Sequence, residues 1–400
     1  MRVLHFYKTS LPDSMGGVEQ VIHQIATGAS KQGVHTEVLA LTTNRMPRTI
    51  EMNGYKVNRA RMNFQIASTG FSASAFLRFS QLAKKADIIH YHFPWPFMDV
   101  VHFATRVKKP SVVTYHSDII RQKYLLKLYR PLKRKFLASV DRIVTTSPNY
   151  LKTSNVLEKF SDKVSIIPIG LDKATYPQPS LEKLQYWRTK LGPKFFLFVG
   201  VIRYYKGLHI LLEAMQGVDY PIVIVGAGPI EDELKALKKQ LGLRNIHFLG
   251  QLPDEDKVAL FTLCYGVVFP SHLRSEAFGV SLLEGAMHGK PMISSEIGTG
   301  TTFINIADLT GLVVPPSDPT ALQQAMRYLW EHPTEAAEMG QRAAERYWQH
   351  FTADQMAQSY VDLYGELLHS RENLHRHYVD QTLARCGDLS ALPHRASDNN

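Results

Sequence analysis

The chain alternates between short runs of apolar residues and longer segments with helical periodicity. Short, continuous apolar runs are typical of parallel strands that are buried on both faces. In the first 170 residues they predict strands at 2–7, 34–42, 87–91, 111–115, 142–146 and 163–167. Helical periodicity predicts helices at 18–33, 73–85, 97–107, 121–139 and 149–158. Strands and helices that alternate in this way indicate a parallel sheet with helices on both faces.

A proline-rich break between Pro168 and Pro179 separates this series from a second one. The second series predicts strands at 195–199, 221–225, 245–249, 266–270 and 291–295, with helices that begin near Gly207, Ile230, Asp254 and Gly279. Helical periodicity then continues through 320–330, 334–347 and 353–369. We therefore predict an α/β fold of two doubly wound, Rossmann-like domains that face each other across a cleft.

The same pattern divides the chain into segments. We predict a first domain at 1–170, a linker at 171–193, a second domain at 194–350, C-terminal helices at 351–386 that could cross back to the first domain, and a polar, disordered tail at 387–400. Ligands of doubly wound sheets bind outside the carboxyl ends of the strands. Residues that follow the predicted strands are therefore the candidates for a functional site.

Two carboxylates, Glu276 and Glu284, lie in the stretch from Ser271 to Glu284. In one continuous helix they would be about 12 Å apart along the axis, which is a poor arrangement for a paired acid and base. A strand ending near Pro270, a loop with Glu276 and a helix that begins near Gly279 fit the sequence better. Free amides at that helix start could hold a phosphate, while the carboxylates bind hydroxyl groups. The simpler alternative is that Glu276 caps a helix and Glu284 is a solvated residue.

Cations and glycines follow other predicted strands. Arg203 and Lys206 lie in a glycine turn at the start of the second domain, where two cations suit a diphosphate, although solvated loop residues would look the same. The glycine turn around Gly228 would let a ligand approach the backbone closely, and tight packing explains it equally well. In the first domain, Gly16 and Gly17 open the first helix and could lend amides to the same phosphates.

The remaining candidate residues give weaker indications of a functional site. His116 stands just past the strand at 111–115. A lone histidine is more often structural than functional, but this one lies at a strand's carboxyl end, so both interpretations stay open. The acidic run 254–256 follows a proline at a helix start, so we interpret it as a cap and first turn rather than a metal motif. The two cysteines fit no disulfide framework or zinc spacing, and we predict no bound metal.

The net charge of +10 is unevenly distributed along the chain. Residues 1–170 carry 25 Lys and Arg against 10 Asp and Glu, whereas residues 171–400 carry 21 against 26. The first half therefore indicates an anionic partner: a membrane surface, an anionic acceptor or nucleic acid. The segment 121–136 has seven basic residues, no acidic ones, and interleaved Leu and Tyr, which is typical of binding to a membrane surface or anionic acceptor. A solvated helix packed by its leucines is the alternative.

The chain shows no signal for secretion or membrane insertion. The apolar run at its amino terminus is too short for a signal peptide, and no stretch approaches the ~20 apolar residues of a membrane span. Together with the cysteine usage, this predicts a cytoplasmic protein.

In combination these motifs resemble the retaining GT-B glycosyltransferases known as glycosyltransferase family 4. The stretch Glu276 to Glu284 is similar to the family's E-x7-E signature. The order of the remaining motifs is similar too, through Gly16-Gly17-Val18-Glu19, Val199-Gly200, Lys206-Gly207, Gly226-x-Gly228-Pro229, Pro270-Ser271, Gly289-Lys290-Pro291 and 311–315. Within the family, the run 201–207 looks like bacterial mannosyltransferases of polysaccharide and O-antigen assembly. One departure is Val201, where many relatives carry Arg, and Arg203 is expected to substitute for it.

The resemblance implies a role for each matching position. Glu276 would contact hydroxyls of the donated sugar, Glu284 would contact the nucleotide ribose, and His116 would lie beside the reacting sugar. Arg203 and Lys206 would neutralise the diphosphate leaving group, which Gly17 would approach from the first domain. The other residues predicted to bind the nucleotide-sugar are Gly16, Gly228, Phe278, Gly279 and Val280. Attack would occur on the front face, with the leaving phosphate helping to deprotonate the acceptor, so that no dedicated base is needed.

The sequence thus predicts a retaining hexosyltransferase that moves mannose from GDP-mannose to a lipid-linked glycan or oligosaccharide in polysaccharide or lipopolysaccharide assembly. A UDP-sugar donor is the alternative, followed by a GT-B sugar-nucleotide epimerase and a non-catalytic polyanion-binding protein. We expect no prosthetic group, no metal and no nucleic-acid partner. The basic segment from Arg121 to Lys135 would place the protein peripherally on the inner face of the cytoplasmic membrane.

Overall fold

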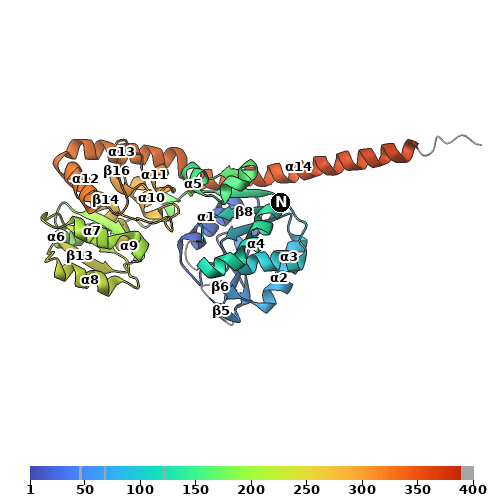
Figure 1. Ribbon diagram of the computed structural model, residues 1–400, viewed down its shortest axis with the longest axis horizontal. Coiled ribbons are helices and arrows are strands. Elements are labelled where there is room, and N and C mark those ends of the chain that lie inside the picture. Colours follow the sequence, from blue (N-terminus) through green and yellow to red (C-terminus); the bar gives the residue numbers. More distant parts are fainter. Residues whose placement is uncertain (45–46, 67–68, 120–122, 389–400) are drawn as a thin grey trace, which may run out of the picture.

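The computed structural model describes residues 1–44, 47–66, 69–119 and 123–388, and the side chains of these residues except 123–125 and 372–388. Figure 1 shows two lobes, with a long C-terminal helix that runs from the second lobe over the first and beyond it. Each lobe is built on its own mainly parallel sheet. The predicted fold of two doubly wound α/β domains is therefore confirmed.

The first sheet has the strand order β10-β9-β8-β7-β1-β2-β4-β3. Its strands are β1 (Arg2–Phe6), β2 (His35–Thr42), β3 (Thr49–Met52), β4 (Tyr55–Arg61), β7 (Ile88–Phe93), β8 (Ser111–Tyr115), β9 (Arg142–Thr145) and β10 (Val164–Ile166). The edge strand β3 runs antiparallel to β4, and the other pairs are parallel. The chain order reverses on the two sides of β1, so a crevice is expected beyond the carboxyl end of this strand.

The second sheet is fully parallel, with the order β13-β12-β11-β14-β15-β16. Its strands are β11 (Phe196–Val199), β12 (Ile222–Val225), β13 (Ile246–Gly250), β14 (Gly266–Phe269), β15 (Met292–Ser295) and β16 (Gly311–Val314). Here the order reverses between β11 and β14. The turn with Arg203 and Lys206 follows β11, and the stretch with Glu276 and Glu284 follows β14, so both lie at this switch point.

Helices cover both sheets. Those of the first domain are α1 (Gly17–Lys31), α2 (Ala73–Lys85), α3 (Pro96–Thr105), α4 (Lys123–Ser139) and α5 (Pro148–Thr153). The second domain has α7 (Leu208–Ala214), α8 (Glu231–Gln240), α9 (Asp254–Leu263), α10 (Val280–Met287), α11 (Thr301–Ile304), α12 (Pro319–Glu331) and α13 (Pro333–His350). The last helix, α14 (Ala353–Asp388), packs on α1 of the first domain. A Cβ on Gly28 of α1 would lie 2.4 Å from Ala357 Cβ, so only glycine permits this close approach.

Some elements were not predicted from the sequence. Strands β3 and β4 form a hairpin through Asn53 and Gly54, which both have positive φ, as an Asn-Gly turn requires. A second short hairpin pairs β5 (Phe64–Ile66) with β6 (Thr69–Phe71). Strand β16 was also missed. The predicted helix at 149–158 is confirmed only as far as Thr153, because Ser154 adopts an extended conformation that ends α5 and a 3₁₀ segment, η1 (Leu157–Lys163), follows.

Two differences concern the predicted segment boundaries. The predicted linker at 171–193 contains a helix, α6 (Leu181–Leu191), which Ser180 caps and which packs on α9 through the hydrogen bond from Trp187 Nε1 to Asp256 Oδ1 (2.8 Å). The predicted C-terminal helices at 351–386 are one helix, α14, which extends beyond the helical periodicity recognised at 353–369. The predicted disordered tail at 387–400 lies outside the described residues except for the last two positions of α14.

Candidate active site

A cavity of about 430 Å³ lies between the two domains. The start of α1 contributes Gly16 and Gly17 to its lining, and α10 contributes Val280 and Glu284. The segment that joins the domains adds Tyr176, and α9 adds Lys257. Four of the predicted site residues, two from each domain, are therefore brought together at one cavity.

The carboxylate of Glu284 is buried at one end of this cavity. It accepts a hydrogen bond from Tyr176 Oη (3.2 Å) and forms an ion pair with Lys257 Nζ (3.4 Å). Burial raises the pKa of Glu284, and Lys257 opposes that rise. Burial also opposes the charge on Lys257, but Glu284 and Asp254 outweigh it and raise the pKa of the lysine. A carboxylate with two donors beside a cavity can bind paired hydroxyls such as those of a ribose.

A second buried carboxylate, Glu276, is paired with Lys206. Ser271 Oγ also donates to Glu276 Oε2 (3.3 Å). The lysine follows β11 in a 3₁₀ turn, η3 (Tyr204–Lys206), and its Nζ lies 4.7 Å from the centre of the Phe269 ring. Gly207 closes this turn at φ +71°, and a Cβ there would lie 2.0 Å from Pro270 O, so the loops after β11 and β14 touch through backbone. This contact sets Lys206 against Glu276.

The sequence prediction for the stretch 271–284 describes the local structure correctly. Glu276 lies in the loop after β14, and α10 begins at Val280 after Gly279, which adopts a left-handed conformation (φ +99°). Ser281 Oγ donates to Val199 O (2.7 Å) and ties the first turn of α10 to the end of β11. The Phe278 side chain is buried, and a Cβ on Gly300 would lie 2.5 Å from its ring, so only the backbone of Phe278 is available to a ligand.

Two further predicted residues lie in different surroundings, Arg203 at the surface and Gly228 in a tightly packed loop. Arg203 is exposed and makes no hydrogen bond or ion pair with a described residue. It faces Lys8 of the first domain, whose pKa is lowered by burial, raised by Glu19 and lowered again by Arg203. Gly228 lies where a Cβ would be 2.0 Å from Ile202 O, so loop packing alone requires a glycine there. At Gly17, by contrast, a Cβ would meet nothing within 4 Å, because the position faces open space.

His116 ends a row of buried histidines that the sequence analysis did not recognise. His5 Nδ1 lies 3.0 Å from His92 Nε2, and His92 Nδ1 lies 3.0 Å from His116 Nε2. His90 stacks on His92 at 4.3 Å and contacts Tyr364 Oη of α14 at 2.6 Å. Burial lowers the pKa of His5 and of His116 to about 3, and lowers those of His90 and His92 well below the usual value. The row is therefore neutral at physiological pH.

The hydrogen-bond pattern assigns the tautomers of this row. His5 Nε2 is buried and has no partner among the described side chains. Because a buried N–H without an acceptor is rarer than an unused lone pair, the proton of His5 is assigned to Nδ1. His5 then donates to His92, and His92 donates from Nδ1 to His116 Nε2. His116 is left with its proton on Nδ1, where it can donate to a ligand.

Among the described residues, three of these histidines are also close enough together to hold a metal ion. His5, His90 and His92 place one ring nitrogen each within 4.8 Å of one another. Both nitrogens of His90 are engaged, by Tyr364 and by Thr114 Oγ1 (2.7 Å). Both nitrogens of His92 are engaged by other histidines, so a metal would have to displace hydrogen bonds that already satisfy the rings. We assign this cluster to hydrogen bonding.

Side chains of both domains meet beside the cavity. Arg274, two residues before Glu276, donates to Thr153 Oγ1 of the first domain (2.7 Å) and to Gly298 O (2.8 Å). It also pairs with Asp118 (3.4 Å), which lies two residues after His116. These contacts link the loop of Glu276 to the loop of His116 and fix how the two halves of the site face each other.

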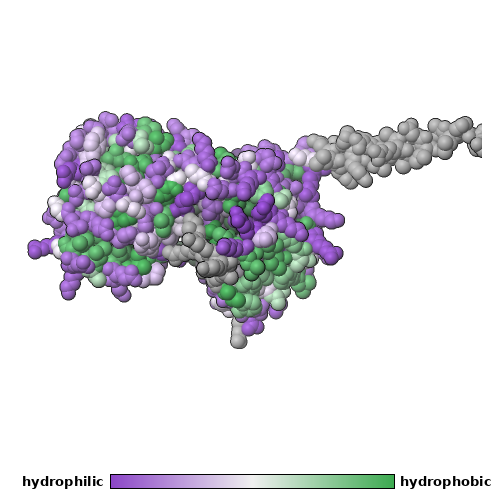
Figure 2. Space-filling view, in the orientation of Figure 1, coloured by the Kyte–Doolittle hydropathy of each residue, from purple (hydrophilic) through white to green (hydrophobic). Residues whose placement is uncertain are grey.

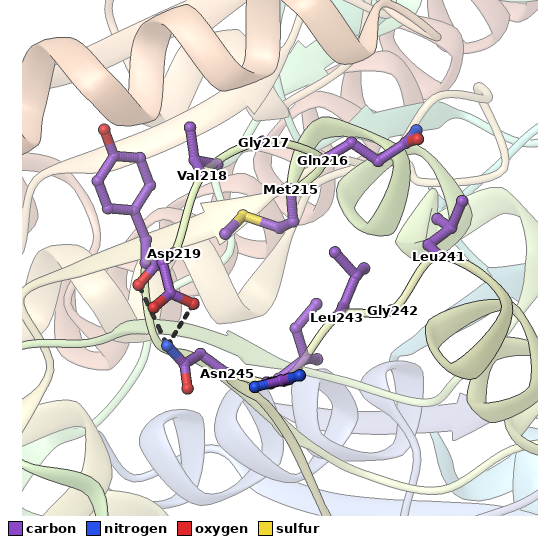
Figure 3. A pocket seen from close by; sticks show the side chains of 12 residues that line it. Met215, Gln216, Gly217, Val218, Asp219, Leu241, Gly242, Leu243 and Asn245 are labelled. Atoms are coloured by element: carbon purple, nitrogen blue, oxygen red, sulfur yellow. Dashed lines mark hydrogen bonds between the residues drawn. The ribbon is translucent and has the colours of Figure 1, made fainter.

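Another hollow lies at the opposite edge of the second sheet. Figure 3 shows it between the segment 215–220 before β12 and the segment 241–246 before β13, with Asn245 Nδ2 bonded to Asp219 Oδ1 (2.5 Å). Both segments precede their strands, so the hollow faces the amino ends of the sheet. Ligands of doubly wound sheets bind at the other edge.

Comparisons with known proteins place the chain in a class. Among solved structures, sucrose-phosphate synthase from Thermosynechococcus elongatus matches with a TM-score of 0.76 and 21% identity over 92% of this chain and 99% of that one. Anabaena HepE in complex with UDP matches with a TM-score of 0.73 and 18% identity over 92% of this chain and 100% of that one. These likenesses show the fold, which is that of the GT-B glycosyltransferases.

Sequence similarity shows the family. The family described as Glycosyltransferase Family 4 matches residues 15–175, and the one described as Glycosyl transferases group 1 matches residues 182–346. The D-rhamnosyltransferase WbpZ of Pseudomonas aeruginosa is 64% identical over 353 residues, 88% of this chain and 93% of the relative. The O-antigen chain mannosyltransferase C of Escherichia coli is 49% identical over 371 residues, 93% of this chain and 100% of the relative. The chain belongs to this family of GT-B glycosyltransferases, and it is an enzyme of the glycosyltransferase class.

The site also contains residues that the sequence analysis missed. Lys8, Tyr176, Lys257 and Arg274 surround the predicted residues, and only Arg274 lies in a stretch that the sequence analysis singled out, where no role was predicted for it. Lys8 follows the first predicted strand almost directly, which was an available signal. The position of Tyr176 depends on how the linker crosses the cleft, which the local sequence does not encode.

Proposed function

We propose that the protein is a retaining hexosyltransferase that transfers mannose from GDP-mannose to a lipid-linked glycan in O-antigen assembly. The observations that carry the proposal are the buried Lys206–Glu276 pair at the second domain's switch point and the cavity between the domains, whose lining includes Glu284. The two relatives at 64% and 49% identity, a D-rhamnosyltransferase and an O-antigen mannosyltransferase, support the hexose and the pathway.

The proposed chemistry follows from the charges. A nucleoside diphosphate bound at the start of α10 would gain negative charge as the sugar departs, and Lys206, Arg203 and Lys8 can stabilise it. Preorganised charges of this kind are worth a few kcal/mol each. Glu276, released from part of its pairing with Lys206, can bind sugar hydroxyls, and Glu284 can bind the ribose between Tyr176 and Lys257. The neutral His116 can donate from Nδ1 to the sugar or the acceptor.

The test is transfer by the purified protein. GDP-mannose with an α anomeric centre should give an α-linked product on a diphosphate-linked sugar acceptor, as measured by the one-bond C–H coupling of the new anomeric carbon. A β-linked product would refute retention. Equal or better transfer from UDP-sugars would refute the choice of nucleotide, and formation of an epimerised nucleotide-sugar without acceptor would refute transfer itself.

A second donor is favoured by the similarity to WbpZ. D-Rhamnose is 6-deoxymannose, so the two candidate donors differ by one hydroxyl group. A site that hydrogen-bonds a hydroxyl rejects the analogue that lacks it far more strongly than an apolar site rejects an added hydroxyl. Comparing kcat/KM for GDP-mannose and its 6-deoxy analogue therefore decides between them.

We also propose that the first domain rests on the inner face of the cytoplasmic membrane. Large apolar side chains are exposed on β5, α2, α3 and α4, at Phe64, Ile66, Leu77, Val100 and Leu128. Figure 2 shows apolar surface on the first lobe, and Figure 1 places these elements on that lobe. Arg121 and the side chains up to 125 lie outside the described residues, but α4 still carries a basic surface next to Leu128. No helix among the described residues is both long and apolar enough to cross a bilayer.

Sedimentation with vesicles tests this proposal. Leu128→Glu, which places a charge at an 82% exposed position of α4, should weaken binding to vesicles that contain anionic lipid. Leu181→Glu of α6, at an 85% exposed position of the second domain, is the matched control and should bind like the wild type. Equal loss in both variants, or in neither, would refute the membrane face.

A further inference from the structure

A second cavity, of about 470 Å³, lies beside the active-site cleft. The first domain lines it with α4, the loop after β8 and the residues after α5, and the second domain adds Arg274. Its basic residues are Lys127, Arg130, Lys133 and Arg274, its acid is Asp118, and its apolar residues are Ile119, Leu126 and Val156. We refer to it as the basic pocket. Such a combination of cations with apolar walls suits an anion that carries a hydrocarbon group.

Lys133 is the residue that points to a missing ligand. Its side chain is only 7% exposed, and it makes no hydrogen bond or ion pair within the described part of the chain. Burial lowers its pKa, while Asp118 and Asp99 favour its charge without coming within ion-pair distance. Asp99 is instead bonded to Tyr129 Oη, and Asp118 pairs with Arg274. A buried cation without a partner is costly, so the position is suited to an anion from outside the chain.

The basic pocket adjoins the site of transfer. Asp118 lies two residues after His116, and Arg274 lies two residues before Glu276. Asp118 and Arg274, which pair with each other and line the pocket, are therefore chain neighbours of the residues that would hold the donated sugar. An anionic group in the pocket would place whatever it carries within reach of the cleft.

We propose that the basic pocket binds the phosphate ester of the acceptor's lipid carrier. Lys133, Arg130 and Arg274 would neutralise the phosphate or diphosphate, and Ile119, Leu126 and Val156 would contact the first carbons of the lipid. This inference rests on the proposed transfer to a lipid-linked acceptor. If the pocket binds the phosphate, the enzyme selects its acceptor by the phosphate as well as by the glycan.

The decisive variant is Lys133→Met, which keeps the length of the side chain and removes a charge that has no partner to lose. Lys84→Met is the matched control, because it makes the same change on an exposed position of α2 that does not line the pocket. Two soluble acceptors carry the same sugar, one on a decyl diphosphate and one on a neutral decyl group. With the diphosphate acceptor, Lys133→Met should raise the acceptor KM at least tenfold and leave the donor KM unchanged.

The control measurements separate the possible failures. The neutral acceptor should serve wild type and Lys133→Met equally, and Lys84→Met should match the wild type with both. Equal losses on both acceptors, or no loss on either, would overturn the proposal. Loss of vesicle binding with an unchanged acceptor KM would assign the pocket to bilayer headgroups and overturn it as well.

Direct binding keeps the inference independent of catalysis. If the wild type transfers to neither acceptor, the proposed function fails, but titration calorimetry with decyl diphosphate still tests the pocket. Decyl diphosphate should bind the wild type and Lys84→Met equally well, and Lys133→Met should bind it at least tenfold more weakly. Equal affinities in the three proteins would refute the pocket.

Discussion

The two domains differ in the charge of the groups that they bring to the site between them. The second domain presents buried ion pairs, Lys206 with Glu276 and Lys257 with Glu284. The first domain presents a row of neutral histidines that ends at His116. Ion pairs at a cavity can exchange a partner for a ligand charge, whereas neutral imidazoles can offer only directed hydrogen bonds. We infer from the comparison that the second domain handles most of the donor's charge, with Lys8 as the first domain's contribution, and that the histidine row orients neutral hydroxyl groups.

Among the predicted changes, removing the charge of Lys206 should lower enzyme activity the most. Lys206→Met should lower kcat by about 100- to 1,000-fold, because one preorganised charge at the leaving group is lost. It also leaves Glu276 buried without its cation, which costs about 3–5 kcal/mol of folding stability. The double variant Lys206→Met/Glu276→Gln should recover most of that stability without recovering activity.

Steady-state kinetics and chemical denaturation measure the two effects separately. Lys235→Met, which removes the exposed ion pair with Glu231 on α8, is the control and should keep wild-type turnover. Activity that returns in the double variant together with stability would show that Lys206 acts on the fold alone.

Filling the cleft at Gly17 should have the next largest effect. A Cβ there would meet nothing within 4 Å, and Gly17 lines the same cavity as Val280 and Glu284, so a larger side chain would occupy part of the cavity. Gly17→Leu should therefore raise the donor KM by about 10- to 100-fold, equivalent to an overpacking cost of about 1–3 kcal/mol.

The control for this variant is Gly365→Leu, which also adds a side chain in open space on a helix but lies far along α14. Both variants should melt close to the wild type. A donor KM that is unchanged in Gly17→Leu would show that the nucleotide-sugar does not pass this position.

A smaller effect is expected from cutting the histidine row. His92→Phe keeps a flat ring but removes the bonds to His5 and His116, so the His116 ring is no longer fixed as a donor from Nδ1. We expect kcat to fall roughly tenfold, about the worth of one well-placed hydrogen bond, with little change in the donor KM. The imidazole nitrogen resonances of His116 should change from a single tautomer to a mixture.

His102→Phe is a matched control for this change. His102 is also buried in the first domain and makes two hydrogen bonds, to Tyr91 Oη (2.8 Å) and Ser139 Oγ (3.2 Å), but lies off the row. It should lose comparable stability and keep its kcat. Identical kinetic losses in both variants would reduce the row to a structural role.

The comparison also explains what the sequence could reveal. The second-domain site was predictable because Lys206, Glu276 and Glu284 lie in local strand, loop and helix signals, where position at a strand end implies position at the cleft. The first-domain row was not, because His5, His90 and His92 occupy strands whose neighbours are set by sheet order rather than by local pattern. Lys257 and Tyr176 depend in the same way on packing between elements far apart in the chain. The hairpin at Asn53-Gly54 had a local signal that was overlooked.

The smallest predicted effect concerns the free energy of unfolding, which should depend on pH because the histidine row is neutral in the folded protein. His5 titrates near 6.5 when the chain is unfolded and at about 3 when it is folded, because burial disfavours its charged form. Between these values the unfolded chain binds the additional proton, so stability falls as the pH falls below 6.5, by about 1 kcal/mol per pH unit for each such histidine. His5→Leu should reduce this slope by about that amount, measured by urea denaturation between pH 6.5 and 5, whatever its effect on stability at neutral pH. An unchanged slope in His5→Leu would mean that the row takes up protons while folded, which would contradict a neutral row.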